Sequence, residues 1–246
     1  MRRVFVPDGC VAGDDAVLGD AEAHYLRSVL RMAPGDRFSA VLPGGPERIA
    51  TVTHVDEERV RATLGQTVTN DADPHVDVRL YMALTKSGKP ELVVQKCTEL
   101  GISSIHPMLC RRSVSRPKAD RAERKSERWQ KISEEAARQC GRTSGAWIAP
   151  AIPFVDALRE IATAGGTGLI LTPDGGEAES RALGEATLSP PVSLLIGPEG
   201  GFDDGEVECA VASGIARARV GRRVLRAETA AIAVSAIVMR ALGEMD

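Results

Sequence analysis

The sequence lacks the features that suggest a disulfide-bonded or metal-binding protein. Its cysteines are few and irregularly spaced, and none form a CxxC pair: Cys10, Cys97, Cys110, Cys140 and Cys209. An odd, scattered set of this kind predicts neither a disulfide framework nor a zinc site. The four histidines are equally dispersed, so we expect no metal ion.

Signals for export and for membrane insertion are also missing. The opening residues MRRVFVPDGC are basic without an apolar stretch behind them, and no apolar run is long enough to cross a bilayer. We therefore expect a cytoplasmic protein with no membrane partner. The GxGxxG and GxxxxGKS patterns are absent as well, which argues against the common dinucleotide-binding and phosphate-binding loops.

The composition that remains is that of an ordinary globular protein. With 246 residues, 43% hydrophobic and 26% charged, the chain has room for two domains. A net charge of −3 argues against a protein that coats nucleic acid indiscriminately. Basic residues nevertheless concentrate between residues 111 and 131, opposed by few acidic ones. This segment is either a phosphate-contacting face or a solvated helix with ion pairs one turn apart.

Residues 1–72 read mainly as short strands. We expect strands at residues 3–6, 38–42, 49–55 and 60–64, separated by glycine and charged turns. One helix, over residues 24–32, is predicted to be capped by Asp20. Its buried side is predicted to carry four residues: Tyr25, Leu26, Val29 and Leu30. Several short strands around one helix favour a small β-barrel.

After a polar linker at residues 69–74, strands and helices alternate. Strands are predicted at 78–84, 102–109, 169–171, 194–196 and near Val220, and helices at 90–100, 121–140, 155–164 and 228–242. This alternation predicts a mostly parallel sheet with helices on both faces. The last helix is apolar nearly all round, so it is buried within the domain or in a dimer interface.

Three glycine-bearing segments follow the expected strands, at residues 172–176, 197–202 and 220–230. Ligands of open α/β sheets bind beyond the carboxyl ends of the strands, and glycine lets the backbone approach them closely. The middle segment leads into a helix with Asp203 and Glu206 in capping-box spacing. Tight turns without a ligand are the alternative. Arg226 and Glu228 either pair with each other or face a pocket.

Taken together, these segments resemble the RsmE family of 16S rRNA uridine N3-methyltransferases. The most specific matches are LIGPEGGF at 195–202 and LRAETA at 225–230. Weaker matches are QKCTELG at 95–101, RSV at 112–114, EAARQCGR at 135–142, and HYLRSVLR at 24–31 followed by PGD. The resemblance covers nearly the whole chain.

The resemblance implies an α/β fold with two domains. A PUA-like RNA-binding β-barrel would occupy residues 1–72, and a trefoil-knotted SPOUT methyltransferase domain residues 75–246. It also implies a homodimer, S-adenosyl-L-methionine as cofactor, and 16S rRNA in the assembled small ribosomal subunit as partner. Rival interpretations are methylation of another RNA, and a non-enzymatic RNA-binding or ribosome-assembly protein.

The resemblance and the chemistry together name candidate site residues. Cofactor contacts are expected at the three loops: Leu171, Thr172, Ile196, Gly197, Pro198, Glu199, Gly200, Gly201, Val220, Gly221, Leu225, Arg226, Thr229 and Ala230. When uracil loses its N3 proton, negative charge develops on its two oxygens, and an arginine is suited to stabilise that charge. A carboxylate is suited to accept the N3 proton. The catalytic candidates are therefore Arg226, Glu199 and Glu228. RNA contacts are expected at six arginines: Arg27, Arg31, Arg111, Arg112, Arg116 and Arg142. Where the family often has glutamate this chain has Arg111, so no carboxylate acts there.

Overall fold

The computed structural model describes residues 1–42, 45–84, 90–113, 119–172, 181–182 and 187–245. It divides into two compact units. The first unit comprises Met1–Asp73 and Gly141–Ser144, and the second comprises Pro74–Cys140 and Gly145–Asp246. Each unit has its own sheet and its own buried core.

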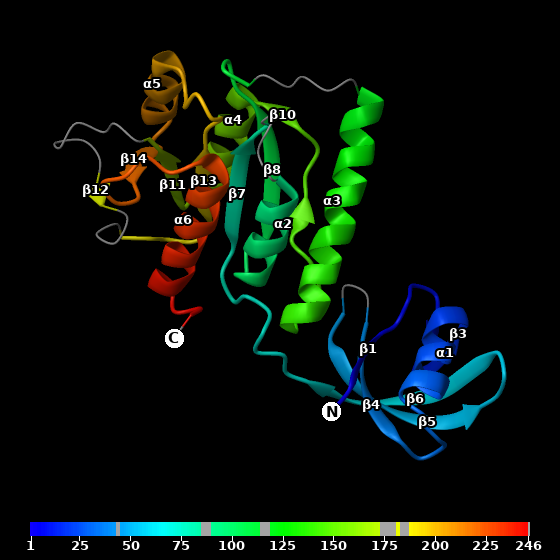
Figure 1. The fold of residues 1–246 in the computed structure, drawn as a ribbon. Coiled ribbons are helices and arrows are strands. Elements are labelled where there is room, and N and C mark those ends of the chain that lie inside the picture. The colour runs from blue at the N-terminus through cyan, green and yellow to red at the C-terminus, as the bar shows by residue number, and fades with distance from the viewer. Residues whose placement is uncertain (43–44, 85–89, 114–118, 173–180, 183–186, 246) are drawn as a thin grey trace. The chain divides into compact units, whose positions relative to one another are not determined.

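The first unit is a curled six-stranded sheet in the order β1-β4-β5-β6-β3-β2 (Figure 1). Its strands are β1 (Arg3–Phe5), β2 (Val11–Ala12), β3 (Asp15–Gly19), β4 (Arg37–Val41), β5 (Glu47–Val55) and β6 (Arg59–Val68). Neighbours run antiparallel except for β1 and β4, which are parallel. Alternate residues such as Leu18, Phe38 and Leu64 point into one core, as the strand periodicity predicts.

The helix of this unit differs from the prediction. A short α1 (Asp20–His24) continues as a π-helix over Tyr25–Val29, in which the Leu30 amide donates to the Tyr25 carbonyl at 2.9 Å. The N-cap is Gly19, and Asp20 is the first helical residue, so the predicted cap is wrong. Leu26 is buried as expected, but Tyr25 and Val29 are 42% and 59% exposed. The wider π turn shifts these side chains off the buried face.

The second unit is built on a parallel sheet in the order β10-β8-β7-β13-β11-β14-β12, with β9 paired to β8. Its strands are β7 (Val78–Ala83), β8 (Ser104–Leu109), β9 (Trp147–Ile148), β10 (Ile152–Pro153), β11 (Thr167–Leu171), β12 (Arg181–Ala182), β13 (Val192–Ile196) and β14 (Ala216–Arg219). The predicted parallel sheet is confirmed, and every paired strand in the described part of this unit runs parallel.

Helices cover both faces of this sheet: α2 (Pro90–Glu99), α3 (Ala119–Cys140), α4 (Phe154–Ala164), α5 (Asp204–Ala212) and α6 (Ala227–Ala241). These bounds confirm the predicted helices to within a few residues. Strand alternation separates two cores. Leu80 and Leu194 pack in the core that also holds residues of α2, α3 and α6. Tyr81 and Leu195 point to the other face, where α4 and α5 pack.

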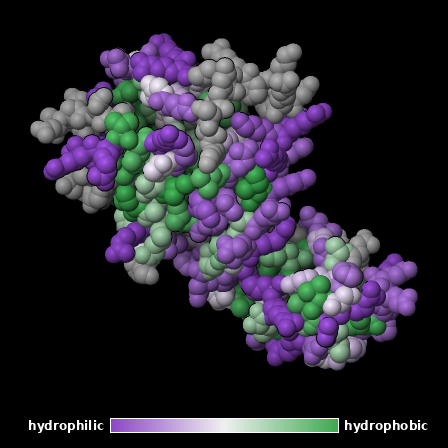
Figure 2. All heavy atoms as spheres, in the orientation of Figure 1, coloured by the Kyte–Doolittle hydropathy of each residue, from purple (hydrophilic) through white to green (hydrophobic). Residues whose placement is uncertain are grey.

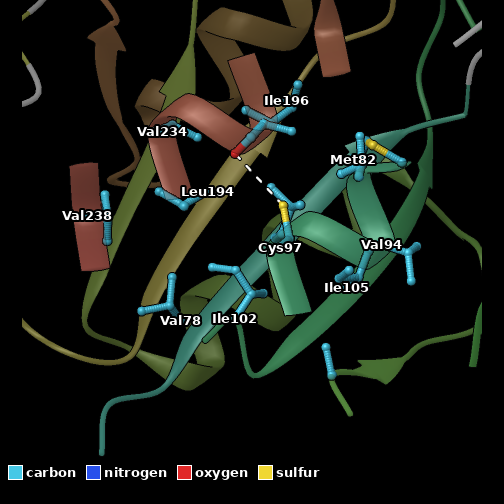
Figure 3. Packing of buried hydrophobic residues seen from close by; sticks show 14 of the residues in the cluster. Val78, Met82, Val94, Cys97, Ile102, Ile105, Leu194, Ile196, Val234 and Val238 are labelled. Atoms are coloured by element: carbon cyan, nitrogen blue, oxygen red, sulfur yellow. Dashed lines mark hydrogen bonds between the residues drawn. The ribbon is translucent and has the colours of Figure 1, made fainter. Parts of the chain in front are cut away.

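Figure 3 shows how closely α2 and α6 meet over the sheet. Cys97 of α2 lies near Leu194 of β13, and its Sγ donates to the Ala231 carbonyl at 4.0 Å. Val234 and Val238 of α6 point into the same core. The predicted burial of α6 is confirmed for the side of the helix that carries Val234 and Val238, while Ile232 and Ile237 are half-buried. In the view of Figure 2, hydrophobic residues gather over α6 and hydrophilic ones over α3.

One short segment crosses the expected division of the chain. Gly141–Ser144 follows α3 but belongs to the first unit. Arg3 and Asn70 both donate hydrogen bonds to the Gly141 carbonyl. The Thr143 amide and hydroxyl donate to Asp73 at 2.8 and 2.7 Å. The first unit is therefore completed by residues that come long after its last strand. Among the described residues, no helix is long and apolar enough to span a membrane.

Candidate functional site

Three strand ends lie side by side at the carboxyl edge of the parallel sheet. Strand β11 lies between β13 and β14, and Leu171 pairs with Ile196 on one side and Ala218 on the other. The segments that follow these strands therefore leave the sheet at one place. They are the three glycine-bearing segments of the sequence, although residues 173–176 of the first lie outside the described part of the chain.

These segments enclose a cavity of about 280 Å³, here called the first cavity. Its lining includes every predicted cofactor residue except Gly200 and Thr229. Four further residues line it that the sequence did not suggest: Arg219, Arg223, Val224 and Ala227. Ala227 and Ala230 belong to the first turn of α6, so the cavity lies against the amino end of that helix.

The first cavity is shaped by residues that keep the backbone close. A Cβ on Gly197 would lie 3.0 Å from the Phe202 ring and 3.2 Å from the Phe202 nitrogen, so no larger residue fits unchanged. Gly201 and Gly221 adopt φ values of +70° and +68°, which glycine tolerates best. Thr172 Oγ1 is buried and has no hydrogen-bond partner among the described residues. A buried orphan hydroxyl and apolar walls fit a ligand with both apolar and polar parts.

The catalytic candidates take different places around this cavity. Arg226 is the N-cap residue of α6 and lines the cavity, as does the exposed Glu199. Glu228 is half-buried and Thr229 is exposed, and neither is among the described lining residues. No ion pair between Arg226 and Glu228 occurs in the described part of the chain. The geometry therefore favours Glu199 over Glu228 as a group that can meet a ligand.

The turn after β8 is fixed to the amino end of α5. The Ser113 amide donates to the Cys110 carbonyl, and Ser113 Oγ accepts from the Cys110 amide, both at 3.0 Å. The Arg111 amide donates to the buried Glu206 carboxylate at 2.8 Å, and Arg111 Nη1 lies 3.0 Å from Asp203 Oδ1. Glu206 and Asp203 form the predicted capping box of α5. Burial raises the pKa of the Cys110 thiol to about 12, so this thiol stays protonated.

A second cavity of about 440 Å³ lies beside this turn and against α5. It shares Thr172 and Gly201 with the first cavity, so the two are neighbours. Its lining is charged as well as apolar: Arg112, Thr172, Gly200, Gly201, Phe202, Asp204, Val207, Glu208 and Arg217. Gly200, predicted to bind the cofactor, lines this second cavity instead. The sequence analysis missed Arg217 and Glu208.

The predicted RNA-contacting arginines do not form one cluster. Arg111 and Arg112 lie together after β8, whereas Arg27 and Arg31 belong to the first unit. Arg27 donates to the backbone carbonyls of Asp56 and Glu57, and Arg31 is exposed. Arg142 is only 4% exposed, and this burial argues against the predicted RNA contact. Arg116 lies outside the described residues.

Helix α3 presents an outer surface with exposed charges of both signs, the glutamates being Glu123, Glu127, Glu134 and Glu135. Arg124, Arg128 and Lys131 are exposed, and Arg128 Nη2 lies 3.8 Å from Glu91. Lys125 lies over the ring of buried Trp129 at 4.7 Å, and burial lowers the pKa of this lysine. Among the described residues, no group of three or more His, Cys, Asp or Glu side chains could hold a metal ion.

Comparison with known proteins gives these features a common context. The model of the RNA methyltransferase domain matches residues 72–239, and the model of the RNA methyltransferase PUA domain matches residues 18–65. These matches place the chain among the RNA methyltransferases. The chain belongs to the ribosomal RNA small subunit methyltransferase E family. It is 32% identical to the Synechocystis member over 93% of this chain and 74% of that protein. It is 30% identical to the Bacillus subtilis member over 88% and 86% of the two chains.

Solved structures agree with this assignment. A ribosomal RNA small subunit methyltransferase E from Neisseria gonorrhoeae, bound to S-adenosyl methionine, superposes with a TM-score of 0.80. It is 27% identical over 98% of each chain. A Legionella pneumophila structure in complex with the same cofactor superposes with a TM-score of 0.78, at 28% identity over 97% of each chain.

Proposed function

We propose that this protein transfers a methyl group from S-adenosyl-L-methionine to N3 of one uridine in 16S rRNA. The substrate is the rRNA within the assembled small ribosomal subunit, and the reaction takes place in the cytoplasm. The observation that carries the proposal is the first cavity, which three adjacent strand-end segments enclose at the carboxyl edge of the sheet. Membership of the family and the cofactor-bound relatives support the same activity.

The first cavity has the groups that the cofactor needs. The methyl sulfonium, when bound, supplies the electrophile of the reaction. The close contact of Gly197 with Phe202 and the positive φ of Gly221 shape two backbone segments that can approach the adenine and amino-acid parts. Thr172 Oγ1 offers a hydrogen bond that is otherwise unused among the described residues. Apolar walls from Leu171, Ile196 and Leu225 keep water away from the ligand.

The uracil must lose its N3 proton and leave charge on O2 and O4. Arg226 lines the first cavity at the start of α6 and carries a permanent, fork-shaped cation suited to that charge. Glu199 lines the same cavity and can accept the N3 proton, whereas Glu228 is not among the described lining residues. On the lining of the first cavity alone, we assign stabilisation of the charge on the uracil oxygens to Arg226 and acceptance of the N3 proton to Glu199.

The target base must also be reachable. Watson–Crick pairing hides the N3 edge, so the uridine has to be unpaired or flipped out of its helix. Arg112 can contact the neighbouring phosphates because it is exposed, and so can three exposed basic residues of α3: Arg124, Arg128 and Lys131. In the first unit, Arg31 is exposed in the connection between the π-helix and β4 and can do the same.

Three structural features belong to the same proposal. We infer that the first sheet closes as a PUA-like barrel over residues 1–72. We also infer that the second domain, residues 75–246, is a trefoil-knotted SPOUT methyltransferase fold. Finally, we infer a homodimer. The half-buried Ile232 and Ile237 of α6 support a dimer, since they leave apolar surface on that helix uncovered.

The test is to incubate the protein with labelled S-adenosylmethionine and small subunits from cells that lack it. The RNA is then digested and the methylated nucleoside identified. We expect N3-methyluridine at a single position. A different methylated nucleoside would keep the cofactor but discard the target. No incorporation into subunits or free RNA, together with no cofactor binding, would favour a non-enzymatic ribosome-assembly protein.

A further inference from the structure

We propose that the second cavity receives the target uracil, with Arg112 and Arg217 donating to its oxygens and Glu208 accepting from N3. This inference rests on the proposed function and adds the place where the substrate base binds. It replaces Glu199 by Glu208 as the acceptor of the single N3 proton, and it adds Arg112 and Arg217 to Arg226 as groups that stabilise charge on the uracil oxygens. It also names two residues, Arg217 and Glu208, that neither the sequence motifs nor the first cavity include.

The first argument is position. The two cavities share Thr172 and Gly201, so a base in the second lies next to a cofactor in the first. They lie on opposite faces of the sheet, the first against α6 and the second against α5. Thr172, at the end of β11, stands between them. Its buried hydroxyl lacks a partner among the described residues and can bond to a ligand on either side.

The second argument is chemical complementarity. The Watson–Crick edge of uracil presents two carbonyl acceptors on either side of one N–H donor. Guanidinium groups donate and never accept, and a carboxylate accepts. Two arginines and one glutamate therefore match the pattern of uracil. Cytosine presents an amino donor where uracil has O4 and an acceptor at N3, so it would leave charged groups unpaired.

The third argument is that Arg112 is held in place. Arg112 Nη1 donates to the Gly200 carbonyl at 2.8 Å, and its Cδ lies 3.7 Å from the Cβ position of Gly200. The turn that carries Arg112 is fixed to α5 through Arg111 and Glu206. A fixed guanidinium loses less entropy when it binds a base.

Arg217 reaches the cavity from the sheet itself. It lies on β14 opposite Ile170 of β11, on the face where α5 packs, and it is half-buried. Phe202 forms an apolar wall and is itself packed against Phe154, with ring centroids 5.6 Å apart. A flat aromatic wall beside polar groups is the usual arrangement for an extruded base.

The experiment uses the full chain with Arg217→Gln and Glu208→Gln. Their matched controls are Arg159→Gln on α4 and Glu134→Gln on α3, both exposed and outside the two cavities. Three measurements are made for each protein: kcat and KM with small subunits, the Kd for S-adenosylhomocysteine, and the Kd of the S-adenosylhomocysteine-loaded enzyme for subunits. Thermal unfolding checks that each variant folds.

We expect Arg217→Gln to lower kcat/KM about 100-fold and to weaken subunit binding, with Arg217→Lys recovering part of both. Glu208→Gln should lower kcat with little change in KM, and its remaining rate should rise with pH as hydroxide replaces the carboxylate. Both variants should bind S-adenosylhomocysteine within about twofold of wild type. The controls should match wild type in every quantity.

Two results would overturn the inference while leaving the proposed function standing. In the first, the wild-type protein methylates uridine and both variants are as active as their matched controls. The other is a loss of S-adenosylhomocysteine binding in both variants, which would make the second cavity part of the cofactor site. Failure of the wild-type protein to methylate any uridine would instead refute the proposed function.

Discussion

The two faces of the parallel sheet differ in what they bury. The face covered by α2, α3 and α6 buries a large apolar core, from Val78 on β7 to Val238 on α6, and the buried polar side chains of its described helices are the uncharged hydroxyls of Thr98, Ser133 and Ser235. The face covered by α4 and α5 includes polar groups. Ser104 Oγ lies 2.9 Å from His106 Nε2, and the His106 ring stacks on Tyr81 with centroids 4.4 Å apart. The cavities differ in the same direction but by degree. Both have charged residues in their lining, but the walls of the first, beside α6, are mainly apolar, whereas charged and polar groups make up more of the second, beside α5.

This contrast suggests that the two cavities at this sheet edge bind different ligands, the cofactor in the first and the target base in the second. Apolar walls and close backbone suit a cofactor that is the same in every turnover. Charged side chains suit a base that must be told apart from other bases. We therefore expect substitutions beside α6 to alter cofactor binding or the methyl-transfer step. Substitutions beside α5 should alter the choice of substrate base and the dependence of the rate on pH.

The largest expected effect tests Arg226 at the edge of the first cavity. Arg226→Ala should lower kcat about 100- to 1000-fold, because it removes a fixed cation from the charge that develops on the uracil. Arg222→Ala is the matched control, since Arg222 is exposed in the same segment and is not among the described lining residues. Labelled methyl incorporation into subunits measures both. Full activity of Arg226→Ala with normal cofactor affinity would show that the assignment is wrong.

A second prediction concerns the backbone beside Phe202. Gly197→Val should weaken S-adenosylhomocysteine binding about 10- to 100-fold, because its side chain would overlap the Phe202 ring and push the segment into the cavity. Gly19→Ala is the control, since a Cβ there meets nothing within 4 Å. Isothermal titration calorimetry measures the affinity. An unchanged Kd for Gly197→Val would mean that this segment does not contact the cofactor.

A third prediction concerns pH and the polar face. Burial, with a contribution from Arg79, lowers the pKa of His106 to about 4, so the folded protein binds a proton there less readily than the unfolded chain. The unfolded state therefore takes up more protons between about pH 6.5 and 4, and stability falls as the pH is lowered through this window. The loss should reach at most about 3 kcal/mol.

Urea unfolding at a series of pH values measures this effect. His106→Gln should flatten the dependence below about pH 6.5, whereas His75→Gln, an exposed histidine of the same unit, should leave it as in wild type. An identical slope in wild type and His106→Gln would assign the acid sensitivity to other groups. The apolar face contains no histidine among its described core residues, so it should not contribute.

The smallest effect concerns the outer surface of α3. Replacing Arg124, Arg128 and Lys131 with glutamine should weaken subunit binding only a few-fold at moderate salt. The slope of log affinity against log salt should shrink by about 2 to 3, close to one for each lost phosphate contact. Arg159→Gln is again the control. A slope that the triple variant leaves unchanged would identify α3 as a solvated helix and place the RNA elsewhere.

The sequence predicted the first cavity well because its signals are local. Glycine at a strand end and a capping box at Asp203 and Glu206 both depend on neighbouring residues, and the parallel order of the sheet then brings the segments together. Arg217, which lines the second cavity, was not predicted because strand alternation does not say which face of the sheet holds a cavity. The RNA contact of Arg142 stays a prediction that its burial disfavours, and this burial depends on residues 70 positions away and more, as the contacts of Gly141 and Thr143 show. The π turn at Tyr25–Val29 has no reliable sequence signal.

The placement of Gly141–Ser144 has a consequence for how the protein is made. The amide and hydroxyl of Thr143 bond to Asp73, and the Gly141 carbonyl accepts from Arg3 and Asn70. A chain emerging from the ribosome must therefore expose all six strands of the first unit, then most of the first half of the second, before those partners arrive. The first unit can therefore form its full set of native contacts only after a segment within the second unit has been translated.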